Sequence, residues 1–368
     1  MKCDSAYLPV LLRQARERLG WSQESVAKGL CAVSYLSKIE NGKIIPTPDL
    51  AQELIRRLGL SMSDSVQSEI ERKLDRFYDH HHVSFSQEEI SSMESSTAVI
   101  DAKLVSYQDG KLDSLTYFEP FFDERQRRKY DELRFWKEEI SEQTFLDRYN
   151  DFEAYSFLAE VSYRHEELFR SLDLWHEALY IAQKKMNIEQ MLEALMGEVV
   201  ARGILRDIEG MERVGEQAKQ LAIMTQDDQV QESLAYNIGA SLLEADRIDE
   251  ALDHLLGCKK KSAFLYHKIA LCYEKQGKTD LARKHIELAQ EMEPSVFFDA
   301  VSYRLDHPDH LREDEYKALL EDCLIEAQEH YHHGFYLFHL RYMLEVLETR
   351  RQYKEAYALL KRHFFTFS

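Results

Sequence analysis

Apolar positions in the first sixty residues fall into short helical stripes separated by helix-boundary residues. The first stripe begins at Pro9, which suits the first turn of a helix, and runs to Leu19 before Gly20 ends it. Ser22 is a good N-cap for a second short stripe over residues 23–28. The pattern therefore predicts two helices joined by a tight connection.

Two further helices complete this N-terminal segment. A third is predicted over residues 33–40, and it ends at Asn41-Gly42, residues that tolerate the left-handed backbone conformation. The fourth begins with Thr47 as cap and Pro48 as first helical residue, and its buried face carries leucines at helical spacing (Leu50, Leu54 and Leu58). Four short helices of this kind predict a compact domain over residues 1–62.

Residues 63–100 have a different pattern. One apolar stripe at positions i, i+4, i+8 and i+11 predicts a linking helix (Val66, Ile70, Leu74 and Phe77). The histidine tract at residues 80–82 and the serine- and glutamate-rich stretch up to residue 100 show no clear periodicity. We expect this second part to be a solvated polar linker.

From residue 101 to the end, the apolar periodicity is helical. Residues 264–294 place small and aromatic side chains at the spacings of a tetratricopeptide repeat, a helical hairpin of roughly 34 residues (Tyr266, Ala270, Tyr273, Ala282, Ala289 and Pro294). A preceding unit has Ala251 where this unit has Ala282, and looser units are predicted at residues 157–182, 195–218 and 340–360. We expect residues 101–368 to form a right-handed tetratricopeptide-repeat superhelix with a concave inner face that binds ligand and mediates dimerisation.

Composition supports an all-α fold. The 368 residues include only 13 glycines and 6 prolines, while charged residues make up 31%, so turn-forming residues are scarce. The five cysteines form no CxxC pair, and we expect reduced thiols. Because the chain shows neither a signal-peptide pattern nor about 18 consecutive apolar residues, we expect a cytoplasmic protein.

Charge is distributed unevenly along the chain. Residues 1–60 carry nine Lys or Arg and six Asp or Glu, a net charge of +3, whereas the whole chain carries −19 and the remainder therefore −22. A basic N-terminal domain on an acidic body is typical of a DNA-binding domain attached to a part that does not bind DNA.

The sequence of residues 23–42, QESVAKGLCAVSYLSKIENG, resembles the lambda-repressor/Cro-like (XRE) helix-turn-helix family. This resemblance makes Gln23 a DNA-contacting residue, and the segment Glu40-Asn41-Gly42 is a hallmark of the family. It also implies three core positions (Ala27, Leu36 and Ile39). The interval between Ala27 and Glu40 is one residue shorter than the usual family spacing.

That shortened turn, together with the repeats, resembles the peptide-pheromone receptors of the Rap/Rgg/NprR/PlcR/PrgX (RRNPP) group. A second local match lies on the predicted inner helix (Tyr236, Asn237, Leu242, Arg247, Glu250 and Leu252). The resemblance implies a quorum-sensing transcription factor in which an asparagine, here Asn237, bonds the backbone of a short signalling peptide.

Five residues are candidates for contact with DNA. Ser34, Tyr35 and Lys38 lie on the predicted recognition helix, where hydroxyls and a lysine suit base edges or phosphates. Gln23 and Lys43 are candidates for phosphate contact. The alternative is that all five are ordinary surface residues. Because few basic residues lie here, we expect a homodimer on a two-fold operator in double-stranded DNA.

Five further residues are candidates for contact with the peptide. Ser233, Asn237 and Glu244 share one predicted inner helix face, and Lys268 and Lys275 share the next. An amide carries both a donor and an acceptor, which suits the main chain of an extended peptide. The alternatives are that Asn237 ties neighbouring helices together and that the charged residues form a solvated face.

Catalytic and metal-binding patterns are missing from the sequence. The histidines at 80–82 and at 330, 332 and 333 cluster without an HExxH pattern, and the chain has no GxSxG, P-loop or Rossmann glycine motif. We therefore expect no metal site, no cofactor and no enzymatic activity. The rival hypotheses are regulation by protein docking, as in Rap proteins, and a phosphatase activity near residues 120–170.

Overall fold

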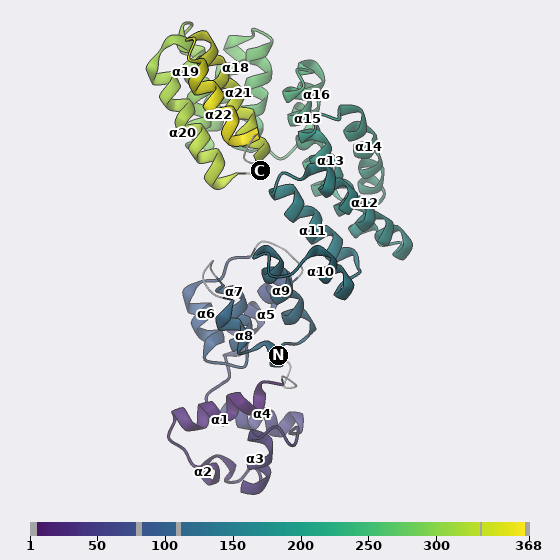
Figure 1. Cartoon of the computed structure of the whole chain (residues 1–368), viewed down its shortest axis with the longest axis vertical. Coiled ribbons are helices and arrows are strands. Elements are labelled where there is room, and N and C mark those ends of the chain that lie inside the picture. The colour runs from purple at the N-terminus through teal and green to yellow at the C-terminus, as the bar shows by residue number, and fades with distance from the viewer. Residues whose placement is uncertain (1–5, 79–82, 108–111, 332, 365–368) are drawn as a thin grey trace. The chain divides into compact units, whose positions relative to one another are not determined.

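The computed structural model describes residues 6–78, 83–107, 112–331 and 333–364. Within these ranges every regular element is a helix and no strand occurs. The chain divides into two compact units, Met1–Arg148 and Tyr149–Ser368 (Figure 1). The all-α prediction is confirmed for the part of the chain that the structure describes.

The first four helices lie where the sequence predicts them: α1 (Leu8–Arg18), α2 (Gln23–Ala27), α3 (Val33–Glu40) and α4 (Pro48–Arg57). The Ser22 hydroxyl caps α2 by accepting a hydrogen bond from the backbone N–H of Ser25 at 3.1 Å. The apolar face of each helix supplies fully buried side chains to one core (Leu12, Val26, Leu36, Ile39 and Leu54). Burial of these stripes is what holds such short helices in place.

Further short helices complete the first unit: α5 (Asp64–Tyr78), α6 (Gln87–Glu94), α7 (Val99–Val105), α8 (Asp113–Thr116), α9 (Glu124–Trp136) and α10 (Glu142–Arg148), with a 3-10 turn at Glu119–Phe121. The helix α5 agrees with the expected linking helix. The expected polar linker, in contrast, contains α6 and the start of α7. Ser86 and Glu89 form a capping box, and Met93 and Ala98 are buried, which explains why this serine-rich stretch is helical.

Aromatic contacts join the four N-terminal helices to the rest of the first unit. The Tyr7 ring lies edge-on to Phe118 and Phe121, with ring centroids 5.3 and 5.1 Å apart. Leu115 and Tyr130 belong to the same core. Residues 101–148 therefore lie with the N-terminal unit, whereas the sequence places them with the repeats.

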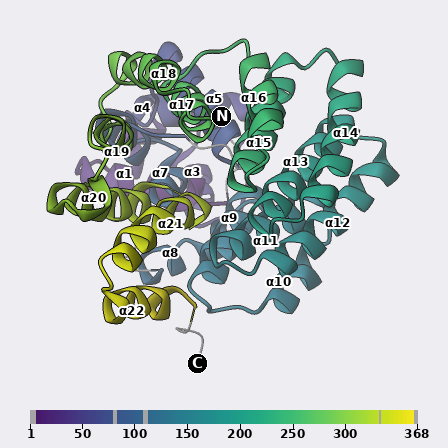
Figure 2. The same ribbon diagram turned by 90° about the horizontal axis from the view of Figure 1, so that it is seen from above.

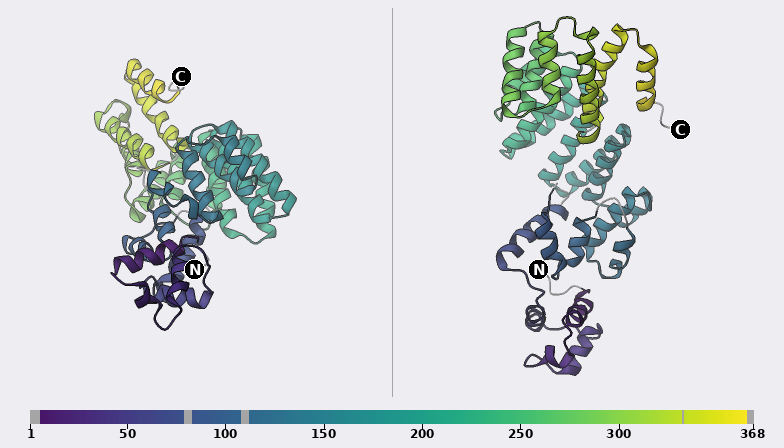
Figure 3. Two further views of the ribbon diagram at one scale, coloured as in Figure 1. Left: turned by 60° about the horizontal axis from the view of Figure 1, so that its bottom comes forward. Right: turned by 90° about the vertical axis from the view of Figure 1, so that its left-hand side faces the viewer.

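The second unit is a series of antiparallel helical hairpins. Its helices are α11 (Phe152–Arg164), α12 (Leu168–Lys185), α13 (Ile188–Ile204), α14 (Ile208–Met224), α15 (Asp228–Glu244), α16 (Ile248–Gly257), α17 (Ala263–Lys275), α18 (Thr279–Met292), α19 (Val296–Asp306), α20 (Asp314–His330), α21 (His333–Thr349) and α22 (Tyr353–Phe364). Consecutive helices pack on each other, and from α11 to α19 each odd-numbered helix also packs on the next odd-numbered one. The helices follow one another around an arc (Figures 2 and 3).

Five consecutive turns between helices of the second unit contain one residue in the left-handed backbone conformation. Positive φ angles occur at Glu166, Met186, Arg206, Gln226 and Asp246, which are spaced twenty residues apart. At each of these turns the next N–H donates back to a carbonyl of the preceding helix, as Asp207 does to Arg202 at 3.0 Å. The regular spacing gives the four helices between these turns, α12 to α15, nearly equal lengths of 17 or 18 residues.

Two alanines test the predicted repeat register. Ala251 of α16 and Ala282 of α18 are both fully buried in the second helix of their hairpins, as the 31-residue offset requires. The four described cysteines are free thiols. In the described parts of the chain, no helix combines the length and the apolar character needed to cross a bilayer.

Candidate nucleic-acid interface and ligand groove

The recognition helix α3 exposes part of the predicted DNA-reading face. Ser34 and Lys38 are exposed and lie one helical turn apart. Tyr35 is half-buried because its ring packs against the core of the helix-turn-helix. Ser34 and Lys38 are thus more accessible to a duplex than Tyr35.

Gln23 serves the structure of the domain. Its Nε2 donates to Glu40 Oε2 at 2.7 Å, and the Glu40 side chain also accepts from Arg16 Nε at 2.7 Å and Nη2 at 3.1 Å. Glu40 is only 2% exposed, so these donors replace the water that its carboxylate loses. The network ties α1, α2 and α3 together and fixes Gln23 at the start of α2.

The shortened turn between α2 and α3 is closed from α4. Arg57 Nη1 donates to the carbonyls of Val26 at 2.8 Å and Lys28 at 2.5 Å. These bonds satisfy the carbonyls at the end of α2, where the chain leaves the helix after five residues. Cys31, at the centre of the turn, is half-buried, and burial raises the pKa of its thiol.

Lys43 lies directly after α3. Its backbone N–H donates to the Lys38 carbonyl at 2.9 Å, and the Asn41 side chain donates to the Ser37 carbonyl at 2.7 Å. The exposed Lys43 side chain is therefore held near the end of the helix that carries Lys38. The structure brings these two lysines and Ser34 together on one element and its adjoining loop.

Asn237 and Ser233 lie on α15 in the second unit. Ser233 is exposed and Asn237 is half-buried. Among the described residues, the Asn237 side chain has no hydrogen-bond partner. The side-chain amide of Asn237 is therefore able to bond another main chain, and nothing in the described chain uses it to tie helices together.

The three charged candidates have different surroundings from those expected. Lys268 is 2% exposed, and its Nζ lies 3.8 Å from the ring centroid of Phe338 and 5.3 Å from that of Phe335. Burial lowers the pKa of Lys268. Lys275 is exposed and pairs with Asp246 at 2.6 Å. The expected open, charged floor is therefore not found at Lys268, because the helix α21 covers it.

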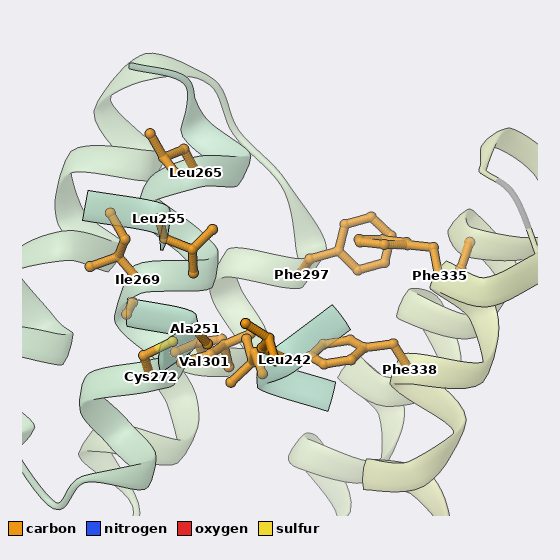
Figure 4. Close-up of a cluster of buried hydrophobic side chains, with 14 of the residues drawn as sticks. Leu242, Ala251, Leu255, Leu265, Ile269, Cys272, Phe297, Val301, Phe335 and Phe338 are labelled. Atoms are coloured by element: carbon orange, nitrogen blue, oxygen red, sulfur yellow. The ribbon is translucent and has the colours of Figure 1, made fainter. Parts of the chain in front are cut away.

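The helix α21 reaches across to α15 and α17. Arg341 Nη1 donates to the Glu244 backbone carbonyl at 2.9 Å. Burial raises the pKa of the Glu244 side chain, while attraction by Lys268 and Arg341 opposes that rise. Figure 4 shows Phe335 and Phe338 extending from α21 into the cluster that holds Phe297 and Leu242. Of the five peptide candidates, only Glu244 and Lys268 lie in this contact.

Two buried histidines accompany Lys268 in this contact. His267 and His339 are nearly parallel, with ring centroids 6.4 Å apart, and His267 Nδ1 and His339 Nε2 have no hydrogen-bond partner in the described chain. Burial lowers the pKa of both rings well below the usual value, and the nearby charges of Lys268 and Arg304 lower it further. Both histidines are therefore neutral at neutral pH.

A cavity of about 700 Å³ lies within the second unit, on α11 and α13 and beside the C-terminal end of α20. Its lining includes Trp175, Glu193 and Tyr331. One residue of the sequence, a glycine inside a predicted helix, points to this site although hydrophobic periodicity does not reveal it. Gly197 falls inside a helix, where a Cβ would lie 2.2 Å from Trp175 Cε2, so the glycine is needed for the ring to pack there.

Histidine clusters form no metal site in the described residues. His330 lies near two carboxylates, Glu326 at 3.9 Å and Glu329 at 3.8 Å, but no group of three or more metal-binding side chains occurs there. The tract at residues 80–82 and His332 lie outside the described residues.

Comparison with known proteins identifies one part of the chain. The helix-turn-helix family HTH_3 matches residues 12–65, so this segment is a helix-turn-helix domain. No curated protein matches the sequence. Among solved structures, the crystal structure of Bacillus thuringiensis PlcR in complex with the peptide PapR7 and DNA is 14% identical, covering 77% of this chain and 99% of that one. The two structures align with a TM-score of 0.34.

Proposed function

We propose that this chain, whose residues 12–65 form a helix-turn-helix domain, is a DNA-binding transcriptional regulator controlled by a short linear peptide. The observation that carries the proposal is the recognition helix α3, which presents Ser34 and Lys38 to solvent on a domain of net positive charge. Such a domain reads base edges in the major groove and phosphates beside it.

The peptide part of the proposal is supported by the second unit. Its hairpins stack odd-numbered helices side by side, and α15 offers the unpartnered amide of Asn237 among the described residues. The sequence pattern around Asn237 resembles the RRNPP peptide receptors, which implies quorum sensing. A regulator of this kind acts in the cytoplasm, as a homodimer on a two-fold operator and without a cofactor.

DNA binding is tested on the full-length protein. Duplexes selected from a random library are titrated by fluorescence anisotropy at several salt concentrations. Replacing Lys38 by Ala is expected to weaken binding. It should also reduce the slope of log affinity against log salt concentration by about one unit for each helix-turn-helix domain that loses a phosphate contact. The matched control is Lys284→Ala, which removes an exposed lysine from α18.

Two results would contradict the DNA-binding proposal. One is the absence of salt-dependent duplex binding by the wild-type protein, which would favour regulation by docking to another protein. The other is an equal loss in Lys38→Ala and Lys284→Ala, which would show that α3 does not read DNA.

Peptide binding is tested by calorimetry with synthetic peptides from short secreted precursors encoded beside the gene. Asn237→Ala should weaken binding about tenfold, since it removes hydrogen bonds to the peptide main chain. The control is Gln220→Ala, which truncates an amide on the outer helix α14 that is bonded to Glu216. Unchanged affinity in Asn237→Ala would remove α15 from the binding site.

A further inference from the structure

The cavity on α11 and α13 is an open groove with an apolar floor. Trp175 of α12, Met196 and Val200 line it. The close approach of α12 and α13 at Gly197 sets the Trp175 ring against the backbone of α13, so that the ring closes the bottom of the groove. Aromatic and aliphatic surfaces of this kind cover the methylene stem of a long side chain.

The walls of the groove are acidic. Glu160 and Glu193 come from α11 and α13, and Glu329 comes from the end of α20. The positive charge in the lining is Arg164, and His330 is a titratable neighbour. Three carboxylates thus face one guanidinium, and the groove has a net negative charge that repels acidic ligands.

Glu193 lies in the groove without a cationic partner among the described residues, and Ser156 is its hydrogen-bond partner. The Glu193 side chain is exposed to the open groove. Partial desolvation by the protein around it raises the pKa of Glu193 to about 7, and repulsion by Glu160, Glu153 and Glu189 adds to the rise. A bound cation would favour the charged form of Glu193, because it would offset that repulsion.

From this arrangement we infer that the groove binds a basic side chain, arginine or lysine, of a peptide ligand. The stem of the side chain lies over Trp175, and its cationic head pairs with Glu193. The volume of about 700 Å³ exceeds one side chain and leaves room for the residues beside it. This inference rests on the proposed function only for the choice of a peptide as the source of the cation.

The test uses calorimetry on the full-length protein with two pentapeptides, acetyl-Gly-Leu-Arg-Leu-Gly-amide and its citrulline counterpart. Citrulline is the neutral isostere of arginine, so the ratio of the two affinities isolates the charge. The arginine peptide is expected to bind at least about tenfold more tightly, as a hydrogen-bonded charge pair requires. In Glu193→Gln the ratio should fall to near one.

Two controls accompany that measurement. Glu209→Gln, which removes an exposed carboxylate from α14, should leave the ratio unchanged. Spermidine, a free polyamine, should compete weakly, because it lacks the flanking main chain. Equal or absent affinity for the two peptides, or an unchanged ratio in Glu193→Gln, would overturn the assignment. If spermidine binds as tightly as the arginine peptide, the inference that the cation belongs to a peptide is wrong.

Acidification gives an independent readout. The affinity ratio should fall between pH 8 and pH 6, since Glu193 takes up a proton near pH 7 and loses its charge. The titratable and charged groups around Glu193 and in the groove lining are Glu153, Glu160, Tyr163 and Arg164 of α11, Glu189 of α13, Glu329 and His330 of α20, and Tyr331 directly after it. His330→Gln removes the neighbouring imidazole and keeps Glu193, so a pH dependence that vanishes in His330→Gln alone would contradict the role of Glu193.

None of these outcomes depends on DNA. A failed peptide result leaves the salt-dependent duplex titration unaffected, so failure of the groove assignment is distinguishable from failure of the proposed regulator. Asn237→Ala, in contrast, should leave the ratio of the two affinities unchanged, because Asn237 does not line the groove and main-chain bonds do not distinguish arginine from citrulline.

Discussion

Glu40 illustrates how a residue of a recognised motif acts through its hydrogen bonds. The sequence marks it as part of a helix-ending hallmark, whereas the structure shows a buried carboxylate held by Arg16 and Gln23. The sequence predicts Gln23 as a candidate for phosphate contact but not its bond to Glu40, because periodicity gives the direction of a side chain and not its partner. The burial of Lys268, a candidate for contact with the peptide, is not predicted for the same reason, since a lysine is rarely buried and α21 covers this one.

Replacing Glu40 by Ala should destabilise the helix-turn-helix by roughly 3 kcal/mol. The Arg16 side chain, which is 13% exposed, would lose its charged partner while remaining largely desolvated. Hydrogen exchange of amides in α1 and α3 measures the change. The matched control is Glu24→Ala, an exposed residue of α2. A loss no larger than that of the control would show that the network contributes little.

Helix positions were the most predictable property of this chain. The start of α2, the end of α3 and the start of α4 follow from Ser22, Gly42 and Pro48, since caps, left-handed glycines and prolines act locally. The Thr47 side chain, predicted as the cap of α4, makes no capping hydrogen bond. The path of α21 over α15 and α17 was not predictable, because it depends on contacts between residues about a hundred positions apart, such as Arg341 and Glu244. Helical periodicity in α21 shows that one face is buried but not which helix buries it.

The contact between α17 and α21 should weaken as the pH falls. His267 and His339 have lowered pKa values in the folded state, so they stay neutral there while the unfolded chain binds protons below about pH 6.5. Their contribution to stability is therefore present above that pH and is lost as the pH falls. Each histidine costs up to about 1.4 kcal/mol per pH unit in this range.

Hydrogen exchange of α17 and α21 at pH 7.5 and 5.5, corrected for intrinsic rates, measures this loss. His339→Phe should remove about one proton from the pH dependence, because phenylalanine keeps a ring in the aromatic cluster and does not titrate. His285→Phe on α18 is the control. An identical pH dependence in wild type and His339→Phe would show that His339 is protonated freely in the folded state.

At the scale of the whole molecule, the division into units was only partly predictable. The sequence places a boundary after residue 62 because the motif and its apolar stripes end there. The structure extends the first unit to Arg148, since aromatic residues near position 120 pack on Tyr7. A short aromatic segment without periodicity does not show in the sequence which residues it packs against. The boundary of the first unit therefore depends on tertiary packing and could not be predicted.

Two truncations test this boundary. A fragment of residues 1–62 should have a lower melting temperature than a fragment of residues 1–148, because Tyr7 loses the rings of Phe118 and Phe121 and is left exposed. Burial of one large aromatic ring with its edge contacts stabilises by about 2–3 kcal/mol. Circular dichroism measures the melting temperature of each fragment. Hydrogen exchange of α1 and α3, compared between the 1–148 fragment and the full-length protein, shows whether that fragment keeps the native stability of these helices. Equal melting temperatures would mean that the helix-turn-helix is independent of residues 101–148. A lower melting temperature for the 1–62 fragment would mean that residues 101–148 stabilise the domain. A change in the packing of those residues would then also change the stability of the recognition helix α3.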